Sequence, residues 1–138
     1  MKAYFLAGLM ICGLVLAAGR SSAHHSFTAE FDGNKPVTLT GTVTKVEWTN
    51  PHVWFYINVK DEKTGQVANW GAEMGPPHGL QRRGWRRDSL KVGDVVTVKG
   101  SLAKNGSNRM NASTVSLPNG LRPGETLDAA SSQGGNVD

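Results

Sequence analysis

The sequence contains a single cysteine, Cys12, among its 138 residues. One thiol cannot form an internal disulfide framework or a cysteine-rich zinc site, so both are excluded. No apolar run reaches the roughly 18 residues of a membrane-spanning helix, and no long run of one charge is present. The length allows one small domain and excludes two large ones.

Residues 1–23 have the three regions of a secretory signal peptide. Lys2 supplies positive charge, residues 4–18 are apolar, and small residues lead up to Ala23. We therefore expect cleavage near Ala23 and a periplasmic or secreted location; a buried core helix and an uncleaved anchor are the alternatives. The processed chain would be cysteine-free, which suits an oxidising compartment, and would not be an integral membrane protein.

Processing also changes the charge. Loss of Lys2 and Arg20 leaves 15 − 2 = 13 basic residues against 11 acidic residues, so the net charge falls from +4 to +2. A charge this small gives no case for nucleic acid as a partner.

The remainder of the chain has the pattern of five short strands. Alternating apolar and β-branched residues predict strands at residues 37–48, 52–60, 66–74, 94–103 and 109–117. Pro77 favours a short helix over residues 78–85, between the third and fourth strands. This order predicts an all-β fold, a small five-stranded OB-like barrel with one short helix between strands 3 and 4. A five-stranded open meander is the alternative.

The domain boundaries follow from this assignment. Residues 24–36 form a polar N-terminal lead-in segment, and residues 37–118 form the OB-like domain. Residues 119–138 are rich in Gly, Ser and Ala with little to bury, so we expect a disordered tail. Gly41 and Gly100 fall inside predicted strands, where glycine permits the bend that closes a barrel.

Five sequence segments indicate a family resemblance. They are AHHSF (residues 23–27), WTNPHVWFY (48–56), MGPP (74–77), RRGW (82–85) and KVGDVVTV (91–98). Through them, residues 23–118 resemble a family of small exported bacterial proteins of unknown function. The resemblance implies an exported protein with an OB-like domain, and it implies no particular activity.

Four histidines, His24, His25, His52 and His78, are the candidate metal ligands. Cleavage after Ala23 would make His24 the first residue, so that its free α-amine and ring Nδ1 could chelate one ion. With a third nitrogen from His52 or His78, such a nitrogen set suits copper better than zinc. His25 could add a ring nitrogen with poorer geometry. The alternative is a polar tail that binds metal weakly, with His52 and His78 serving a turn and a helix start.

The second predicted strand has two faces. The alternation places His52, Trp54 and Tyr56 opposite the apolar face that lines the barrel. Exposed Trp54 and Tyr56 could stack on a flat ligand. Alternatively, the lead-in covers both rings through Phe27 and Phe31, which would also bring His24 towards His52.

A short basic segment is the remaining candidate for ligand binding. Guanidinium groups bind phosphate and carboxylate, and an indole offers a stacking face, which suits an anionic lipid headgroup, glycan or protein of the cell envelope. The alternative is a solvated turn paired with Asp88, Asp94 and Glu73. The residues concerned are Arg82, Arg83, Trp85, Arg86 and Arg87.

The carboxylates are scattered, and no nucleophile has a positioned base, so the sequence makes no case for catalysis. We expect a binding module rather than an enzyme. The first hypothesis is a periplasmic copper-binding protein, and the second is a metal-free recognition module for an anionic envelope component. A copper enzyme is the third hypothesis.

Overall fold

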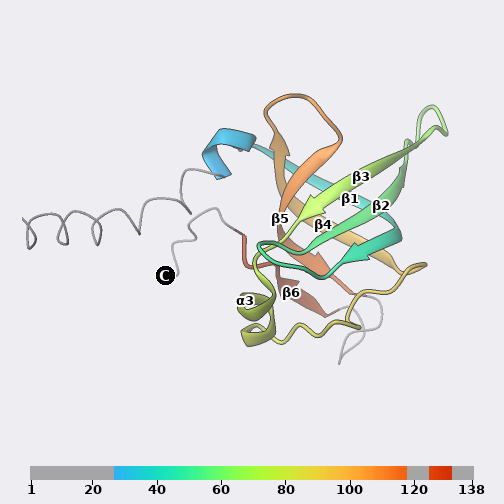
Figure 1. Ribbon diagram of the computed structural model, residues 1–138. Helices are drawn as coiled ribbons and strands as arrows, with labels where there is room; N and C mark the ends of the chain where they lie inside the picture. Colours follow the sequence, from blue (N-terminus) through green and yellow to red (C-terminus); the bar gives the residue numbers. More distant parts are fainter. Residues whose placement is uncertain (1–26, 118–124, 132–138) are drawn as a thin grey trace, which may run out of the picture.

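The computed structural model describes residues 27–117 and 125–131, which form six strands and two short helical segments (Figure 1). Residues 27–30 are helical. The elements that follow are β1 (Phe31–Glu47), β2 (Trp54–Lys60), β3 (Val67–Glu73), α3 (Pro77–Arg82), β4 (Val95–Ala103), β5 (Arg109–Ser116) and β6 (Thr126–Asp128). The predicted signal peptide, residues 1–23, lies outside the described residues.

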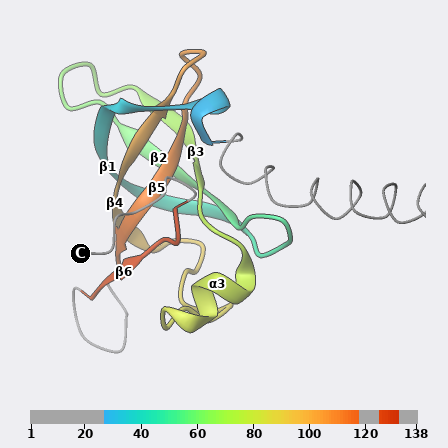
Figure 2. The same ribbon diagram turned by 90° about the vertical axis from the view of Figure 1, so that its left-hand side faces the viewer.

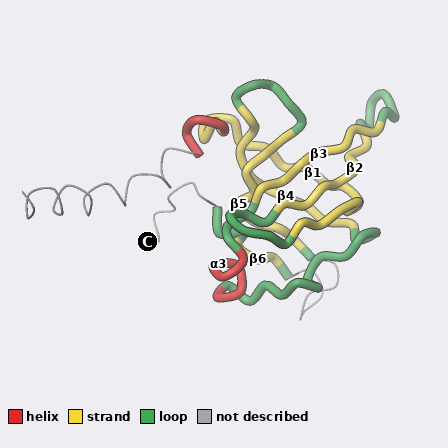
Figure 3. The backbone as a smooth tube through the Cα atoms, in the orientation of Figure 1, coloured by secondary structure: helices red, strands yellow, loops and turns green. Residues whose placement is uncertain are grey.

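The strands close into a barrel through one long strand and one parallel pairing. β1 pairs antiparallel with both β2 and β4, and the strand order is β3-β2-β1-β4-β5-β6. β3 then pairs in parallel with β5, which brings Glu73 opposite Asn111 and closes the ring (Figure 3). The predicted OB-like barrel, with its helix between the third and fourth strands, is confirmed.

Alternation along the strands separates the core from the outer surface. In β2, Phe55 and Ile57 are fully buried, whereas Trp54 and Tyr56 on the other face are half-buried. The core joins apolar side chains from β1 to β5 and includes Leu80 of α3. Burial of such side chains stabilises the fold by about 1.5–3 kcal/mol each. The face of β2 that was predicted to line the barrel is therefore the face that contributes to its stability.

Two glycines sit where the strands bend closely past one another. A Cβ on Gly100 would lie 2.0 Å from the carbonyl oxygen of Asn111, and one on Gly41 would lie 2.5 Å from that of Asn58. The β4–β5 register shifts between Lys99 and Gly100. In the β1–β2 ladder the shift falls between Val43 and Lys45, not at Gly41.

Helix α3 covers one end of the barrel, and the helical residues 27–30 lie at the other end (Figures 1 and 2). Pro77 occupies the first turn, where its missing N–H costs no hydrogen bond. Leu80 faces the core, as expected. The helix ends at Arg82, before Gly84, whose positive φ of 91° does not continue a helix, so the expected range of 78–85 was too long.

Both boundaries of the predicted domain need correction. β1 begins at Phe31, so part of the expected lead-in, residues 24–36, belongs to the sheet. At the other end, β6 and the fully buried Ala129 lie within residues 119–138, the expected disordered tail. Backbone hydrogen bonds hold this segment, including one from Gly75 N–H to the Ala129 carbonyl at 2.8 Å, and such bonds need no hydrophobic sequence. Within the described ranges, no helix is long and apolar enough to cross a membrane.

Candidate functional site

A cavity of about 420 Å³ lies beside the β3–β5 pairing, between the turn that precedes β2 and the helical residues 27–30. The turn before β2, with its cis Asn50–Pro51 bond, forms one wall. The cross-strand pair Trp54 and Glu73 and the first residue of β5, Arg109, add side chains from three strands. The cavity is lined by Glu30, Thr49, Asn50, Pro51, His52, Trp54, Glu73 and Arg109.

The imidazole of His52 is held by a buried carboxylate. His52 Nδ1 lies 2.5 Å from Glu73 Oε1, and because an ionised carboxylate only accepts, Nδ1 is the donor. Glu73 is 9% exposed, so this charged hydrogen bond offsets the cost of removing the carboxylate from water. The bond leaves Nε2 of His52 without a hydrogen-bond partner among residues 27–117 and 125–131.

Asn111 and Ser131 hold the other oxygen of the Glu73 carboxylate in place. Asn111 Nδ2 donates to Glu73 Oε2 at 3.2 Å, and Asn111 itself is almost fully buried. Ser131, beyond β6, donates from Oγ to Asn111 Oδ1, which orients the amide so that its NH₂ group faces Glu73. The polar chain Ser131–Asn111–Glu73–His52 therefore joins four segments that are far apart in sequence.

Trp54 forms the floor between the cavity and the N-terminal segment. The Arg109 guanidinium lies over its ring, 4.5 Å from the ring centroid, as in a cation–π contact. Trp54 also packs against the small cluster of Phe27, Phe31 and Ala103. The lead-in thus packs on Trp54, one of the two rings that the alternative in the sequence analysis expected it to cover.

Tyr56 belongs to a different group of contacts, on the outer face of β1 and β2. Its hydroxyl donates to Glu47 Oε2 at 3.1 Å, and Lys45 Nζ pairs with Glu47 at 2.5 Å. Burial, and then the hydrogen bond to Glu47, raise the pKa of Tyr56, while the bond from Lys45 lowers the pKa of Glu47. Tyr56 also lies near Trp54, since a Cβ on Gly71 would lie 3.3 Å from the Tyr56 ring and 3.5 Å from the Trp54 ring, so a shared stacking surface stays a prediction.

The basic segment, which begins at the last residue of α3, has two of its four arginines paired with carboxylates. Arg83 Nε lies 3.0 Å from Asp128 Oδ1, and Arg86 Nε lies 3.3 Å from Asp88 Oδ1. Asp88 was named in the sequence analysis as a partner of this segment, whereas Asp128 was not. Arg82 and Arg87 are exposed.

Trp85 does not offer the expected stacking face. It is 2% exposed, and its Nε1 donates to the Asp128 carbonyl at 2.7 Å. The prediction that Trp85 binds a ligand is wrong, because the indole fills the core beneath β6.

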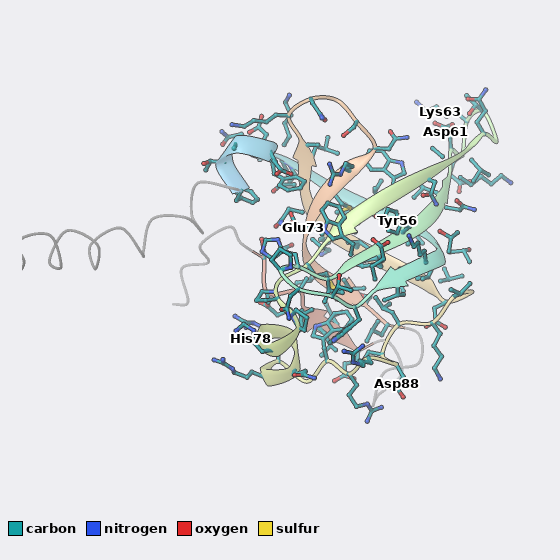
Figure 4. All side chains as sticks on the ribbon, viewed as in Figure 1. Tyr56, Asp61, Lys63, Glu73, His78 and Asp88 are labelled. Carbon is teal, nitrogen blue, oxygen red and sulfur yellow. The ribbon has the colours of Figure 1, made fainter. Side chains whose placement is uncertain are left out.

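The histidines do not converge within the described residues. His78 is exposed on α3, away from Glu73 (Figure 4), and His24 and His25 lie outside the described residues. No group of three His, Cys, Asp or Glu side chains that could hold a metal occurs in residues 27–117 and 125–131. Of the candidate ligands His52 and His78, His52 is the one whose ring is oriented by a carboxylate, that of Glu73.

Three residues of this site were not identified from the sequence: Glu73 as the partner of His52, and Asn111 and Arg109. The sequence carried one signal for Glu73. If residues 61–65 form a hairpin loop, the β2–β3 ladder that pairs Lys60 with Val67 also pairs Trp54 with Glu73, and so places Glu73 close to His52. Asn111 and Arg109 reach the site only through the parallel β3–β5 pairing, which leaves no local signal.

Comparisons place the chain in a family without assigning an activity. The profile of the Family of unknown function (DUF6152) matches residues 11–112, which are 102 of the 138 residues, so the chain belongs to this family. No curated protein matches the chain. Among solved structures, the ZRD-deleted mutant of TiaS in complex with agmatine aligns with a TM-score of 0.47 and 23% identity. The alignment covers 78% of this chain and 32% of that one, so the chain spans about a third of that protein's length.

Proposed function

We propose that the protein is an exported, non-enzymatic binding module that holds a copper ion at the mouth of its barrel, in the periplasm or outside the cell. His52 Nε2 supplies one ligand, and the α-amine and ring of His24, freed by cleavage after Ala23, supply two more. The single observation that carries the proposal is the buried Glu73 that fixes the His52 ring through Nδ1.

The His52–Glu73 pair has the form of a supported metal ligand. Histidines that bind metals characteristically donate their other ring N–H to a carboxylate, which sets the tautomer and makes the ligating nitrogen more basic. Here Nδ1 donates to Glu73, and the imidazole borders the cavity. Imidazole nitrogen suits copper and zinc, and an amine–imidazole chelate adds preference for copper.

His24 is close in sequence to residues that border the same cavity. Phe27 packs in the cluster that also contacts Trp54, and Glu30 lines the cavity wall. His24 is three residues before Phe27, a separation that spans at most about 10 Å. An α-amine with a pKa of about 7.7–8.0 loses its proton readily to a metal ion near neutral pH. His25 is the substitute ligand if the terminal chelate does not form.

The test combines the mass of the exported protein with copper titrations. Intact mass must first identify His24 as the first residue. Copper(II) is then titrated into the processed protein, a form whose N-terminal amine is acetylated, and the His52→Gln variant. We expect both changes to weaken binding by about tenfold or more, with His78→Gln as the matched control. Equal affinities in all four proteins would overturn the proposal.

The alternative proposal is metal-free recognition of an anionic envelope component. Its support is the exposure of Arg82 and Arg87 beside α3; the partial pairing of Arg83 and Arg86 weakens it. The experiment is co-sedimentation with vesicles containing anionic phospholipid. Binding that falls with salt and with joint substitution of these four arginines would support this function, and unchanged binding would exclude it.

A further inference from the structure

Besides Glu73, which is bonded to His52, two exposed residues of opposite charge, Glu30 and Arg109, border the cavity. Glu30 and Arg109 both line it, and neither side chain has an ion-pair partner within 4.0 Å in the part of the chain that the structure describes. Arg109 instead lies over the Trp54 ring. A guanidinium held by stacking is pre-organised for a carboxylate, since less side-chain freedom is lost on binding.

The same two residues connect this cavity with a neighbouring one. A second cavity of about 260 Å³ shares Glu30 and Arg109 with the first, and Phe31 and Lys104 are on its wall. Residues 27–30 are fixed there, because the Lys104 N–H donates to the Glu30 carbonyl at 2.9 Å and Lys104 Nζ donates to the Thr28 carbonyl. The backbone of Glu30 is thus attached to the barrel. The larger volume lies within the range of small-molecule sites.

We propose that this cavity binds a small zwitterion of the amino-acid class, with its carboxylate on Arg109 and its ammonium group on Glu30. A simple anion would gain a bidentate bond from Arg109 but would be repelled by Glu30. A simple cation would be attracted by Glu30 but repelled by Arg109. A ligand that carries both charges satisfies both walls. The site shares the cavity with the proposed copper ion but uses other side chains, so either proposal can fail alone.

Matched small molecules test the charge requirement on metal-free processed protein. L-alanine carries both groups, propionate lacks the ammonium group, and ethylamine lacks the carboxylate. Binding is followed by NMR through the Trp54 indole N–H, assigned with Trp54→Phe. We expect a saturable shift with L-alanine, and binding of the two single-charge probes that is weaker by about tenfold or more, the effect of one charged hydrogen bond.

Variants locate the two contacts. Arg109→Gln should weaken L-alanine binding by about tenfold or more. Glu30→Gln should do the same for L-alanine and should not weaken propionate. Lys60→Gln, which changes an exposed lysine that lines neither cavity, is the control and should leave binding unchanged. Copper affinity measured on Arg109→Gln separates this proposal from the metal proposal, because no metal ligand is altered.

Three outcomes would overturn the inference. The first is the absence of any saturable shift with L-alanine. The second is propionate or ethylamine binding as tightly as L-alanine, which would show that only one charge is recognised. The third is L-alanine binding that Arg109→Gln leaves intact. The comparison of probes uses the unsubstituted protein, so it holds even if a variant fails to fold.

Discussion

Removal of the His52 ring tests whether a charged hydrogen bond holds the site together. In His52→Ala, Glu73 Oε1 loses the donor that lies 2.5 Å away, while Oε2 keeps Asn111 at 3.2 Å. Hydrogen bonds to charged groups contribute about 1.5–3 kcal/mol. The Glu73 side chain is 11% exposed, so water can replace the lost donor only in part. We expect the free energy of unfolding to fall by about 1.5–3 kcal/mol.

The magnitude should depend on the charge of residue 73. In a Glu73→Gln background, the bond from His52 becomes a neutral one, which contributes about 0.5–1.5 kcal/mol. The same His52→Ala substitution should therefore cost about 1 kcal/mol less there. Urea denaturation of the four proteins of this double-mutant cycle, at neutral pH and without metal, gives both values.

His78→Ala is the matched control for this cycle, because His78 is exposed on α3. Its effect should stay within about 0.5 kcal/mol, as for ordinary surface substitutions. A cost of His52→Ala that is the same in both backgrounds, or no larger than that of His78→Ala, would refute the reasoning. The ring of His52 would then have no energetic coupling to the buried carboxylate.

Other substitutions test the remaining parts of the structure. Gly100→Ala places a Cβ about 2.0 Å from the Asn111 carbonyl oxygen, so we expect a loss of about 1–3 kcal/mol in denaturant unfolding; unchanged stability would contradict the close approach. Ser131→Ala removes the donor to Asn111 Oδ1 and should lower the free energy of unfolding by about 0.5–1.5 kcal/mol, whereas an unaltered midpoint would show that residue 131 does not support the site. Absorbance titration should give Tyr56 a pKa above 10.0, and Glu47→Gln should lower it because the Glu47 carboxylate raises it; no change would contradict the contact. Since the folded state holds this proton more tightly, Tyr56 favours folding below pH 10 and that contribution is lost as the pH rises through its folded pKa.

The barrel could be predicted because its signals are local. Alternation in β2 identified the buried Phe55 and Ile57, and the order of five strands and one helix was sufficient for the OB-like topology. β6 could not be predicted in this way. Its attachment depends on backbone pairing with β5 and on the Trp85 indole bond to Asp128, and neither has a hydrophobic pattern in the sequence.

The site was only partly predictable from the sequence. The period of β2 placed His52 and Trp54 on one face, which agrees with their shared cavity. The supporting groups come from the ends of other strands, and only barrel closure places Asn111 beside Glu73. For Trp85 the sequence was misleading. Its neighbouring arginines suggested that the residue is exposed, but the large indole is buried, because it supplies much of the core of a small domain.

The most direct test of the copper proposal is the response of the individual histidine rings to the metal ion. Copper(II) is paramagnetic and broadens the NMR resonances of nearby nuclei. On addition of one equivalent to the processed protein, we predict that the imidazole signals of His24 and His52 disappear together while those of His78 stay sharp. Persistent His52 signals alongside broadened terminal histidines would contradict the account, because the ion would then be held by the chain terminus alone.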